Sequence, residues 1–424
     1  MREMKDSGIA WIGVIPQDWE IVRTKSLYCS AKEIAGDRAD DFERLALTLN
    51  GVIKRSKEDS VGLQPEKFSG YQILKKGELV FKLIDLENVA TSRVGLSPYT
   101  GIVSPAYIVL SKQSRAKDLV VRYSMYHFLS MWQREIFNQM GDNGVRSSLN
   151  TKELLNIPHP FPSIYEQKRI VTFLDAQCAE IDAVLEKTHA SIEEYKKLKQ
   201  AIITQAVTKG IRGDRPMKDS GIEWIGDIPA EWDVIRVKQL LKERNERSKE
   251  GKEEPLSMSQ KVGLVPTKFL ESIPNMASSF VGAKLAYVDD LVFNKLKAHL
   301  GVFSVSRYDG LVSPDYAVYC STGKSNLKYL EYIFKTPQCI GEFRKKSTGI
   351  AAGLMRLYTE GLFSIYLPYP ALSEQEEIAE YLNEKCAGID ALIAKKQQYL
   401  TEIENYKKSL IYEYVTGKKE VHPL

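Results

Sequence analysis

The segment Met4–Glu20 reads MKDSGIAWIGVIPQDWE, and Met217–Asp233 reads MKDSGIEWIGDIPAEWD. Of the 17 aligned positions, 12 are identical, at an offset of 213 residues. Solenoid and propeller repeats have much shorter periods, of about 20 to 50 residues. This repeat therefore predicts that the chain of 424 residues contains two copies of a whole domain, each followed by a connecting segment.

The similarity continues in the same order along both copies. The further matched pairs are Gly77–Phe81 with Asp289–Phe293, Gly101–Tyr107 with Gly310–Tyr316, Glu166-Gln167 with Glu374-Gln375, and Ile181–Ala183 with Ile389–Ala391. Between them, Leu47–Phe68 and Leu256–Phe269 have little in common. A frame that stays similar around segments that diverge indicates two different binding surfaces on one scaffold.

The first part of each copy, residues 1–163 and 217–372, is predicted to be a mixed domain. Runs rich in β-formers, such as Ala106–Leu110 and Tyr316–Tyr319, lie between Gly, Pro and Ser turn signals. Helical spacing of apolar residues occurs as well, as in Val120–Phe137. Strands and helices intermixed in this way predict an α+β domain.

The second part of each copy, residues 164–209 and 373–416, is predicted to be one long helix. Apolar residues recur there at alternating steps of three and four, which is typical of a coiled coil. The residues predicted to pair the helices are Leu174, Ile181, Leu185, Ile192, Leu382, Ile389, Ile393 and Leu400. Ser163 and Ser373 are each followed three residues later by glutamate, the spacing of a capping box. We expect the two helices to pair with each other; packing of each on its own domain is the alternative.

Residues 210–216 form a short linker between the copies, and residues 417–424 form a tail. If a pseudo-twofold axis relates the copies, their long helices must run antiparallel. The predicted fold class is therefore α+β, with two similar mixed α/β domains separated by two long antiparallel helices that form a coiled coil with pseudo-twofold symmetry.

The chain lacks the sequence signatures of catalysis. It contains neither a P-loop nor a G-x-G-x-x-G motif, and its five cysteines and five histidines lack the common metal-ligand spacings, so we expect no cofactor and no metal. The net charge of +4 permits a polyanionic partner without requiring one. The first residues, MREMKDSG, have no apolar core and no stretch approaches 18 apolar residues, so we expect a cytoplasmic protein without membrane contact.

One short run has two interpretations. Ser104–Tyr107 (SPAY) and Ser313–Tyr316 (SPDY) superficially resemble the N-P-P-Y tetrapeptide of DNA amino-methyltransferases. Both lack the second proline and the amide, and no glycine-rich cofactor loop accompanies them. A turn that leads into a buried strand is the favoured interpretation.

Taken in order and in duplicate, these motifs resemble those of the specificity subunit of type I restriction–modification systems. The matching elements are Trp19 and Trp232, the L-V-F and G-I/L-V-S-P-x-Y runs, and the P-x-P tripeptide ahead of each Glu-Gln pair. The resemblance covers essentially the whole chain. Each motif alone is weak, but their ordered duplication is specific.

This resemblance implies that residues 1–163 and 217–372 are target-recognition domains, each reading one half of a bipartite site in double-stranded DNA. It implies that the helices act as a spacer and as a dock for two methyltransferase subunits. Restriction subunits, which are ATP-dependent translocases and nucleases, can join that complex. Adenine methylation and cleavage then belong to the partners, and this chain is a non-catalytic subunit. Because its two readers differ, the site should be asymmetric.

Candidate DNA contacts are polar and basic residues of the divergent segments, of the segments after the L-V-F runs and of two glycine-rich loops, because Arg, Lys, Asn and Gln make most contacts to phosphates and base edges. They are Asn50, Lys54, Arg55, Lys82, Asn143, Arg146, Gln260, Lys261, Lys295, Lys297 and Arg356. Arg146 and Arg356 end glycine-rich loops that would let a backbone approach a duplex; an ordinary surface loop is the alternative. The first long helix carries seven acids and seven bases, which suits protein contacts better. The competing function is therefore a coiled-coil protein-interaction scaffold without DNA recognition.

Overall fold

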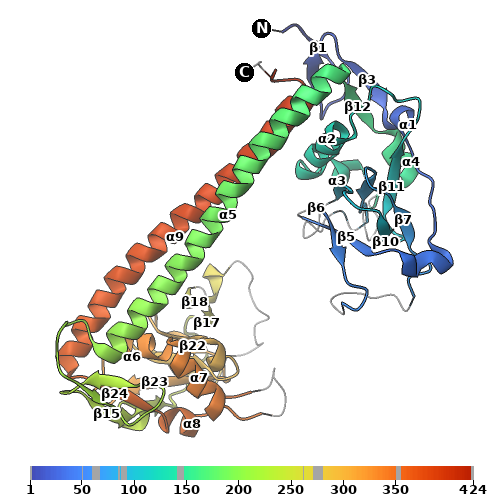
Figure 1. Ribbon diagram of the computed structural model, residues 1–424. Coiled ribbons are helices and arrows are strands. Elements are labelled where there is room, and N and C mark those ends of the chain that lie inside the picture. Colours follow the sequence, from blue (N-terminus) through green and yellow to red (C-terminus); the bar gives the residue numbers. More distant parts are fainter. Residues whose placement is uncertain are drawn as a thin grey trace. The chain divides into compact units, whose positions relative to one another are not determined.

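The computed structural model describes residues 2–49, 51–59, 67–84, 86, 93–140, 148–260, 262–270, 280–349 and 355–421. The chain divides into two compact units (Figure 1). Unit 1 contains Met1–Thr188 together with Gln397–Leu424, and unit 2 contains His189–Lys396. Strands and helices are intermixed in both units, which confirms the predicted mixed α/β class.

The strands of unit 1 form two four-stranded sheets and two strand pairs. The first sheet has the order β6-β5-β10-β7 and contains β5 (Arg44–Thr48), β6 (Gly51–Arg55), β7 (Gln72–Leu74) and β10 (Gly101–Val103). The second has the order β4-β11-β8-β9 and contains β4 (Tyr28–Cys29), β8 (Leu79–Phe81), β9 (Val94–Leu96) and β11 (Ile108–Lys112). The pairs are β1 (Met4–Asp6) with β2 (Val14–Pro16), and β3 (Glu20–Arg23) with β12 (Pro158–Phe161).

The helices of unit 1 cover these sheets and lead into the first long helix. They are α1 (Thr24–Leu27), η1 (Gly36–Asp41), α2 (Val121–Gln133), α3 (Ile136–Met140) and α4 (Thr151–Asn156). The stretch 120–137, with helical spacing throughout, is thus two helices rather than one. Glu135 lies between them with a φ of 58°, a left-handed conformation that an α-helix cannot include.

Unit 2 repeats this strand order. The pairs are β13 (Met217–Asp219) with β14 (Asp227–Pro229), β15 (Asp233–Arg236) with β24 (Tyr366–Tyr369), β17 (Leu256–Ser259) with β18 (Gly263–Pro266), and β19 (Lys284–Ala286) with β22 (Gly310–Val312). The four-stranded sheet β16-β23-β20-β21 contains β16 (Leu241–Arg244), β20 (Leu291–Asn294), β21 (Phe303–Val305) and β23 (Tyr316–Ser321). The helices are η2 (Val237–Gln239), η3 (Thr267–Phe269), η4 (Ala298–Leu300), α6 (Leu327–Phe334), α7 (Pro337–Lys346) and α8 (Thr359–Phe363).

The G-I/L-V-S-P-x-Y run has the same structural role in both units. Its glycine allows a close approach, because a Cβ atom on Gly101 would lie 2.5 Å from the carbonyl oxygen of Glu43, and one on Gly310 would lie 2.2 Å from that of Glu254. The serine and proline then form a turn in which Tyr107 N–H donates to Ser104 O at 3.1 Å. The interpretation as a turn leading into a strand is confirmed, and the likeness to a methyltransferase tetrapeptide is coincidental.

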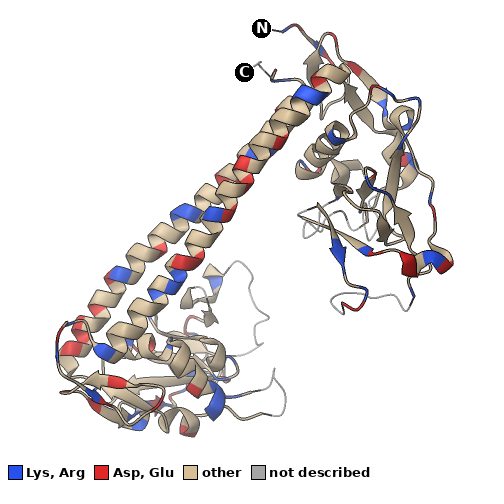
Figure 2. Ribbon diagram, viewed as in Figure 1, with Lys and Arg blue, Asp and Glu red and all other residues tan. Residues whose placement is uncertain are grey.

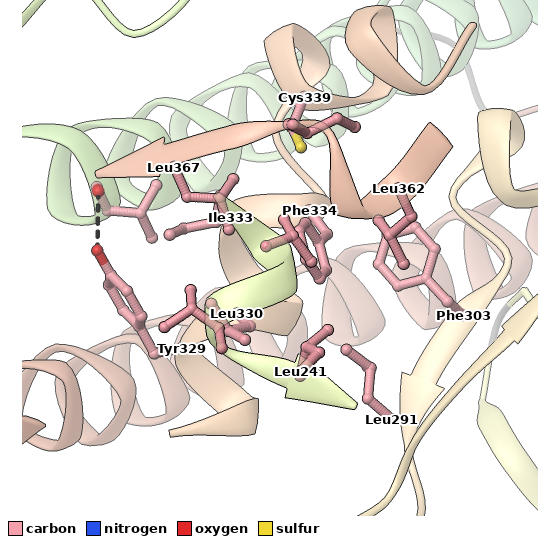
Figure 3. Close-up of a cluster of buried hydrophobic side chains, with 14 of the residues drawn as sticks. Leu241, Leu291, Phe303, Tyr329, Leu330, Ile333, Phe334, Cys339, Leu362 and Leu367 are labelled. Atoms are coloured by element: carbon pink, nitrogen blue, oxygen red, sulfur yellow. Dashed lines mark hydrogen bonds between the residues drawn. The ribbon is translucent and has the colours of Figure 1, made fainter. Parts of the chain in front are cut away.

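Buried aliphatic and aromatic side chains stabilise each unit. In unit 2, Leu330, Ile333 and Phe334 of α6 lie among residues of the neighbouring strands, including Leu291 and Leu367 (Figure 3). All five are at most 1% exposed. Burying a side chain of this size stabilises a fold by about 1.5–3 kcal/mol, so this cluster holds the sheet and α6 together.

Each unit also contains parts of two long helices, α5 (Ile164–Lys209) and α9 (Leu372–Val415). Ser163 caps α5, since its hydroxyl accepts from Glu166 N at 3.3 Å. The prediction that Ser373 caps α9 is wrong. Gln375 N donates to Ala371 O at 3.0 Å, so Ala371 is at the helix start and Ser373 lies within the first turn. Side chains of the following Glu374 and Gln375 secure this helix start instead, as described below.

Candidate functional site

The predicted DNA contacts of unit 2 come from segments that lie next to one another. Lys295 and Lys297 follow β20, and Lys295 O accepts from Leu357 N at 3.0 Å, directly after Arg356. Arg356 itself forms a β-bridge with Thr348 through two backbone hydrogen bonds of 2.8 and 2.9 Å. The structure thus brings the end of the second glycine-rich loop beside the lysines that follow the L-V-F strand.

Gln260 joins this group from a different direction. It lies in the turn between β17 and β18, and its Nε2 donates to Leu300 O at 3.2 Å. Leu300 N in turn donates to Lys297 O at 2.9 Å. Arg356 is restrained by Asp315, at 3.4 Å, but keeps 39% of its side chain exposed. Two lysines, an arginine and an amide therefore converge on one part of unit 2, which suits contact with a polyanion.

Unit 1 shows the same arrangement at the residues that correspond. Leu149 N donates to Leu83 O at 2.9 Å, and Ser148 forms a β-bridge with Ile84. Lys82 comes directly before Leu83, and its backbone N–H donates to Arg93 O at 3.0 Å. The residues that follow the first glycine-rich loop therefore pair with the segment after β8, as Leu357 pairs with the segment after β20.

Lys54 and Arg55 lie on β6, at the edge of the first sheet, and both are held in ion pairs. Lys54 Nζ is 2.6 Å from Glu43, and Arg55 Nε is 2.7 Å from Asp59. These contacts raise the pKa of both side chains, because the donated hydrogen bonds favour their charged forms. Lys54 remains half exposed, at 51%. Both residues are fixed in position, and contact with a phosphate would have to compete with these carboxylates.

Four of the predicted contacts lie outside the described residues, so the structure places none of them. These are Asn50, Asn143, Arg146 and Lys261.

The residues predicted to pair the helices fall into both units. In unit 1, Leu174 is fully buried with Cys178 against Leu410 and Ile411 of α9, and Leu400 is 7% exposed. In unit 2, Leu382 is fully buried with Ile378 against Ile203 and Val207 of α5. Ile192 and Ile389 are also buried, whereas Ile181, Leu185 and Ile393 are partly exposed.

Within each unit the two helices run antiparallel. In unit 1, the rings of Phe173 and Tyr414 pack together with their centres 4.4 Å apart, and Asp182, further along α5, binds Lys407, which comes earlier on α9. In unit 2, Lys396 lies over Tyr195, and the later Lys199 binds the earlier Asp390. In both units, residues further along α5 contact residues that come earlier on α9, so the two helices point in opposite directions.

Two of these contacts are the same interaction made twice. Lys199 Nζ lies 2.6 Å from Asp390, and Lys407 Nζ lies 2.5 Å from Asp182. Lys407 is Lys199 shifted by 208 residues, and Asp390 is Asp182 shifted by the same number. The aspartate of each repeat therefore binds the lysine of the other. Lys199 and Lys407 lie at positions where the apolar spacing of the long helices would place an apolar residue, and each forms an ion pair with the other helix instead.

The Glu-Gln pair at each helix start binds the helix to its globular domain. Glu166 accepts from Trp19 Nε1 at 2.9 Å and from Arg2, and Glu374 accepts from Trp232 Nε1 at 2.8 Å and from Arg215 at 2.7 Å. Both acids are largely buried, and a buried acidic side chain is stabilised when hydrogen bonds and a basic partner satisfy it, as they do here. The duplicated Trp and Glu-Gln motifs were visible in the sequence, but their mutual contact was not predicted.

The glutamine of each pair satisfies three backbone groups. Gln167 accepts from Val120 N at 2.8 Å and donates to Pro162 O at 2.9 Å and Asp118 O at 3.1 Å. Gln375 makes the corresponding contacts, accepting from Asn326 N at 3.0 Å and donating to Pro370 O at 3.0 Å and Lys324 O at 3.5 Å. Both side chains are fully buried. The motifs that carry the family resemblance are therefore mainly structural.

Among the residues that the structure describes, no group of three or more His, Cys, Asp or Glu side chains could hold a metal ion. In the same part of the chain, no helix is both long and apolar enough to cross a membrane. Lys, Arg, Asp and Glu are interspersed along both long helices (Figure 2).

The fold is that of known solved structures. A chain from a study of complex assembly and conformational transition of the type I restriction–modification system matches with a TM-score of 0.70 at 13% identity, over 96% of this chain and 99% of that one. The HsdS subunit of Thermoanaerobacter tengcongensis matches with a TM-score of 0.50 at 14% identity, over 96% and 98% of the two chains. These likenesses show the class of fold.

The relatives agree with this class. The chain is 23% identical over 431 residues to the type I restriction enzyme MjaVIII specificity subunit of Methanocaldococcus jannaschii, covering 97% of this chain and 95% of that protein. It is 25% identical over 432 residues to the putative MjaX specificity subunit of the same organism, covering 97% and 96%. No protein-family model matches the chain. Relatives and solved structures together support its identification as a specificity subunit of a type I restriction–modification system, which confirms the predicted resemblance.

Proposed function

We propose that this chain is the non-catalytic subunit that recognises DNA for a type I restriction–modification complex. Its two target-recognition domains, residues 1–163 and 217–372, read the two unlike halves of an interrupted, asymmetric site. Bound methyltransferase subunits then methylate adenine there, and restriction subunits cleave when they join. The observation that carries this proposal is the repeated strand order with different residues at the corresponding surfaces.

The surface near Lys295 supports the role in DNA binding. Lys295, Lys297, Gln260 and Arg356 come from three separate segments of unit 2 and converge there. Lysine and arginine side chains that bind phosphates fix a protein on the duplex, while amide and guanidinium groups distinguish bases. Lys82 of unit 1 directly follows its own L-V-F strand, one position before Leu83, the residue that corresponds to Lys295.

The long helices support the role of a spacer and a dock. Each unit has a matched pair of exposed apolar residues on them: Val184 and Tyr406 in unit 1, at 39% and 54%, and Leu198 and Leu392 in unit 2, at 49% and 44%. Leu392 follows Val184 by 208 residues, and Tyr406 follows Leu198 by the same number. Two equivalent apolar surfaces suit two copies of one methyltransferase subunit.

Binding of DNA by the complex with its methyltransferase tests this proposal. Methylome sequencing of a host that expresses both proteins should give one bipartite, non-palindromic site. Affinity for that site should fall steeply between 50 and 200 mM salt, because phosphate contacts release counterions. Lys297→Ser should weaken binding, whereas Lys238→Ser, the same charge change elsewhere in unit 2, should not. Intact methyltransferase binding without any sequence-specific DNA binding would favour the scaffold function instead.

A further inference from the structure

The hairpins β5–β6 and β17–β18 have the same position in the two units. Strand β5 pairs in parallel with β10 at Arg44 and Ile102, and Pro255, directly before β17, forms a parallel bridge with Leu311 of β22. Gly101 and Gly310 permit this approach, as described above. The bases of the two hairpins are therefore fixed in the same way, although their sequences have little in common (Figure 1).

The tips of these hairpins carry unusual residues. Thr48 pairs with Gly51, so two residues connect β5 and β6, and Ser259 pairs with Gly263, so three residues connect β17 and β18. The two glycines have φ values of 88° and 76°, which explains their presence. Turns of this kind favour Gly, Asn, Asp and Ser. Turn chemistry therefore does not account for the aliphatic residues in these loops, Leu49 and Val262.

Burial does not account for them either. Leu47 and Val52 of the first hairpin and Leu264 of the second are at most 6% exposed, whereas Leu49 is 60% and Val262 is 62% exposed. A single exposed aliphatic side chain is common on protein surfaces. What distinguishes Leu49 and Val262 is that such a residue recurs at the corresponding tip of two hairpins that otherwise diverge.

The surroundings of the tips are basic and polar. Gln260, in the same turn as Val262, donates to Leu300 O, and this contact keeps the turn beside the segment that carries Lys297. In unit 1, Lys54 lies on β6 opposite Leu45, three residues beyond Gly51, with its Nζ 2.6 Å from Glu43 and 5.2 Å from the centre of the Tyr99 ring. An aliphatic group beside cations fits a DNA groove, where cations bind phosphates and an apolar side chain contacts the methyl group of thymine.

We propose that Leu49 and Val262 are specificity-determining residues, each contacting base edges in its own half of the DNA site. The proposal rests on the proposed function and adds the residues that distinguish the two halves. The constant frame of each unit holds the hairpin, and the aliphatic tip supplies an apolar contact that depends on the base pair.

Methylome sequencing of variants tests this directly, with the complete chain expressed beside its methyltransferase. Leu49→Ala should relax the sequence requirement in one half of the site, and Val262→Ala should relax it in the other half. Gel shifts with uracil in place of each thymine of the site should show a loss of about fourfold in wild-type affinity at the contacted position, as expected for one methyl group. The same uracil should have no effect on the matching alanine variant.

Val14→Ala and Val288→Ala are matched controls, since both side chains are about half exposed, at 47% and 51%, and lie away from the hairpin tips. They should leave the methylated site unchanged. Because Leu49 and Val262 are exposed, their variants should also melt at the wild-type temperature. Unrelaxed specificity in both tip variants, with a normal bipartite site for the wild type, would overturn this proposal alone. A wild-type complex that methylates no defined site would overturn the proposed function as well.

Discussion

Acid should weaken unit 1 selectively, because its core contains two histidines that unit 2 lacks. His127 of α2 and His159 of β12 are both fully buried, with ring centres 4.5 Å apart. His159 Nε2 lies 2.9 Å from Ser124 Oγ, and His127 Nε2 has no hydrogen-bond partner among the residues that the structure describes. The equivalent of His159 in unit 2 is Leu367, since His159 pairs with Val22 as Leu367 pairs with Ile235. The equivalent of His127 is Ile333, because it follows Tyr329 by four residues as His127 follows Tyr123, and both tyrosines donate to the carbonyl of the corresponding proline.

Burial lowers the pKa of both histidines, and for His159 it lowers the pKa from 6.5 to about 4. The folded protein therefore binds protons less readily than the unfolded chain. Stability is complete above pH 6.5 and declines as the pH falls toward 4. Each tenfold change in proton affinity corresponds to about 1.36 kcal/mol. His159 alone should therefore lower the free energy of unfolding of unit 1 by about 3 kcal/mol once the pH is below 4, and by about 2 kcal/mol at pH 5.

Hydrogen exchange measured by mass spectrometry reports on the two units separately. Between pH 7.5 and pH 5, after correction for intrinsic rates, peptides from α2 and β12 should lose about thirtyfold in protection through unfolding of unit 1. Peptides from α6 and β24 of unit 2 should keep their protection over the same pH range. The double variant His127→Ile, His159→Leu copies unit 2 and should remove the pH dependence of unit 1. Equal acid sensitivity of both units, or an unchanged dependence in the double variant, would refute the reasoning.

Four other experiments test the frame of the fold. Gln167→Ala should destabilise unit 1 by about 1–3 kcal/mol, measured by urea unfolding, because Val120 N and two carbonyls lose a buried partner; no loss would mean that water replaces the amide. Lys407→Asp should lower the melting temperature of unit 1, and adding Asp182→Lys should raise it again. The regained free energy of unfolding should be up to about 1 kcal/mol, the usual range for exposed pairs; failure of the rescue would show that the pair is unimportant. Tyr329→Phe should cost unit 2 about 1 kcal/mol in urea unfolding, since its hydroxyl lies 3.3 Å from Val207 O; an unchanged midpoint would contradict that contact. Gly101→Ala should displace the β5–β6 hairpin and impair recognition of one half-site in methylome sequencing, while the other half stays intact; impairment of both halves would contradict this assignment.

Sequence patterns predicted the features that depend on local periodicity and on duplication. The seven-residue apolar spacing predicted helices near 164–209 and 373–416, and the structure has α5 and α9 over nearly the same residues. The mixed class followed from short strands between turn signals. The exact helix start at Leu372 could not be predicted from such patterns. Ser373 has the sequence spacing of a cap, but the buried side chains of Glu374 and Gln375 fix the helix start through tertiary contacts.

Contacts between distant residues could not be predicted. Nothing local to Trp19 indicates that its indole N–H meets Glu166, 147 residues away, or that Arg2 binds the same carboxylate. The candidate site shows the same limit. Lys295 and Arg356 were singled out separately, and only the backbone pairing of Leu357 with Lys295 places them together. Leu49 and Val262 were not singled out, because an aliphatic residue in a charged segment gives no sequence signal of its own.

The make-up of unit 1 has a consequence for how the chain matures on the ribosome. Ile12, Ile15 and Trp19 share a core with Leu410, Ile411 and Val415, which are translated after the whole of unit 2. Unit 2 is contiguous, from His189 to Lys396, and contains all of its own core. Residues 1–188 must therefore wait until Leu410–Val415 have left the ribosome, whereas unit 2 should acquire its structure earlier. Premature termination shortly before Leu410 would leave unit 1 incomplete while unit 2 folds normally.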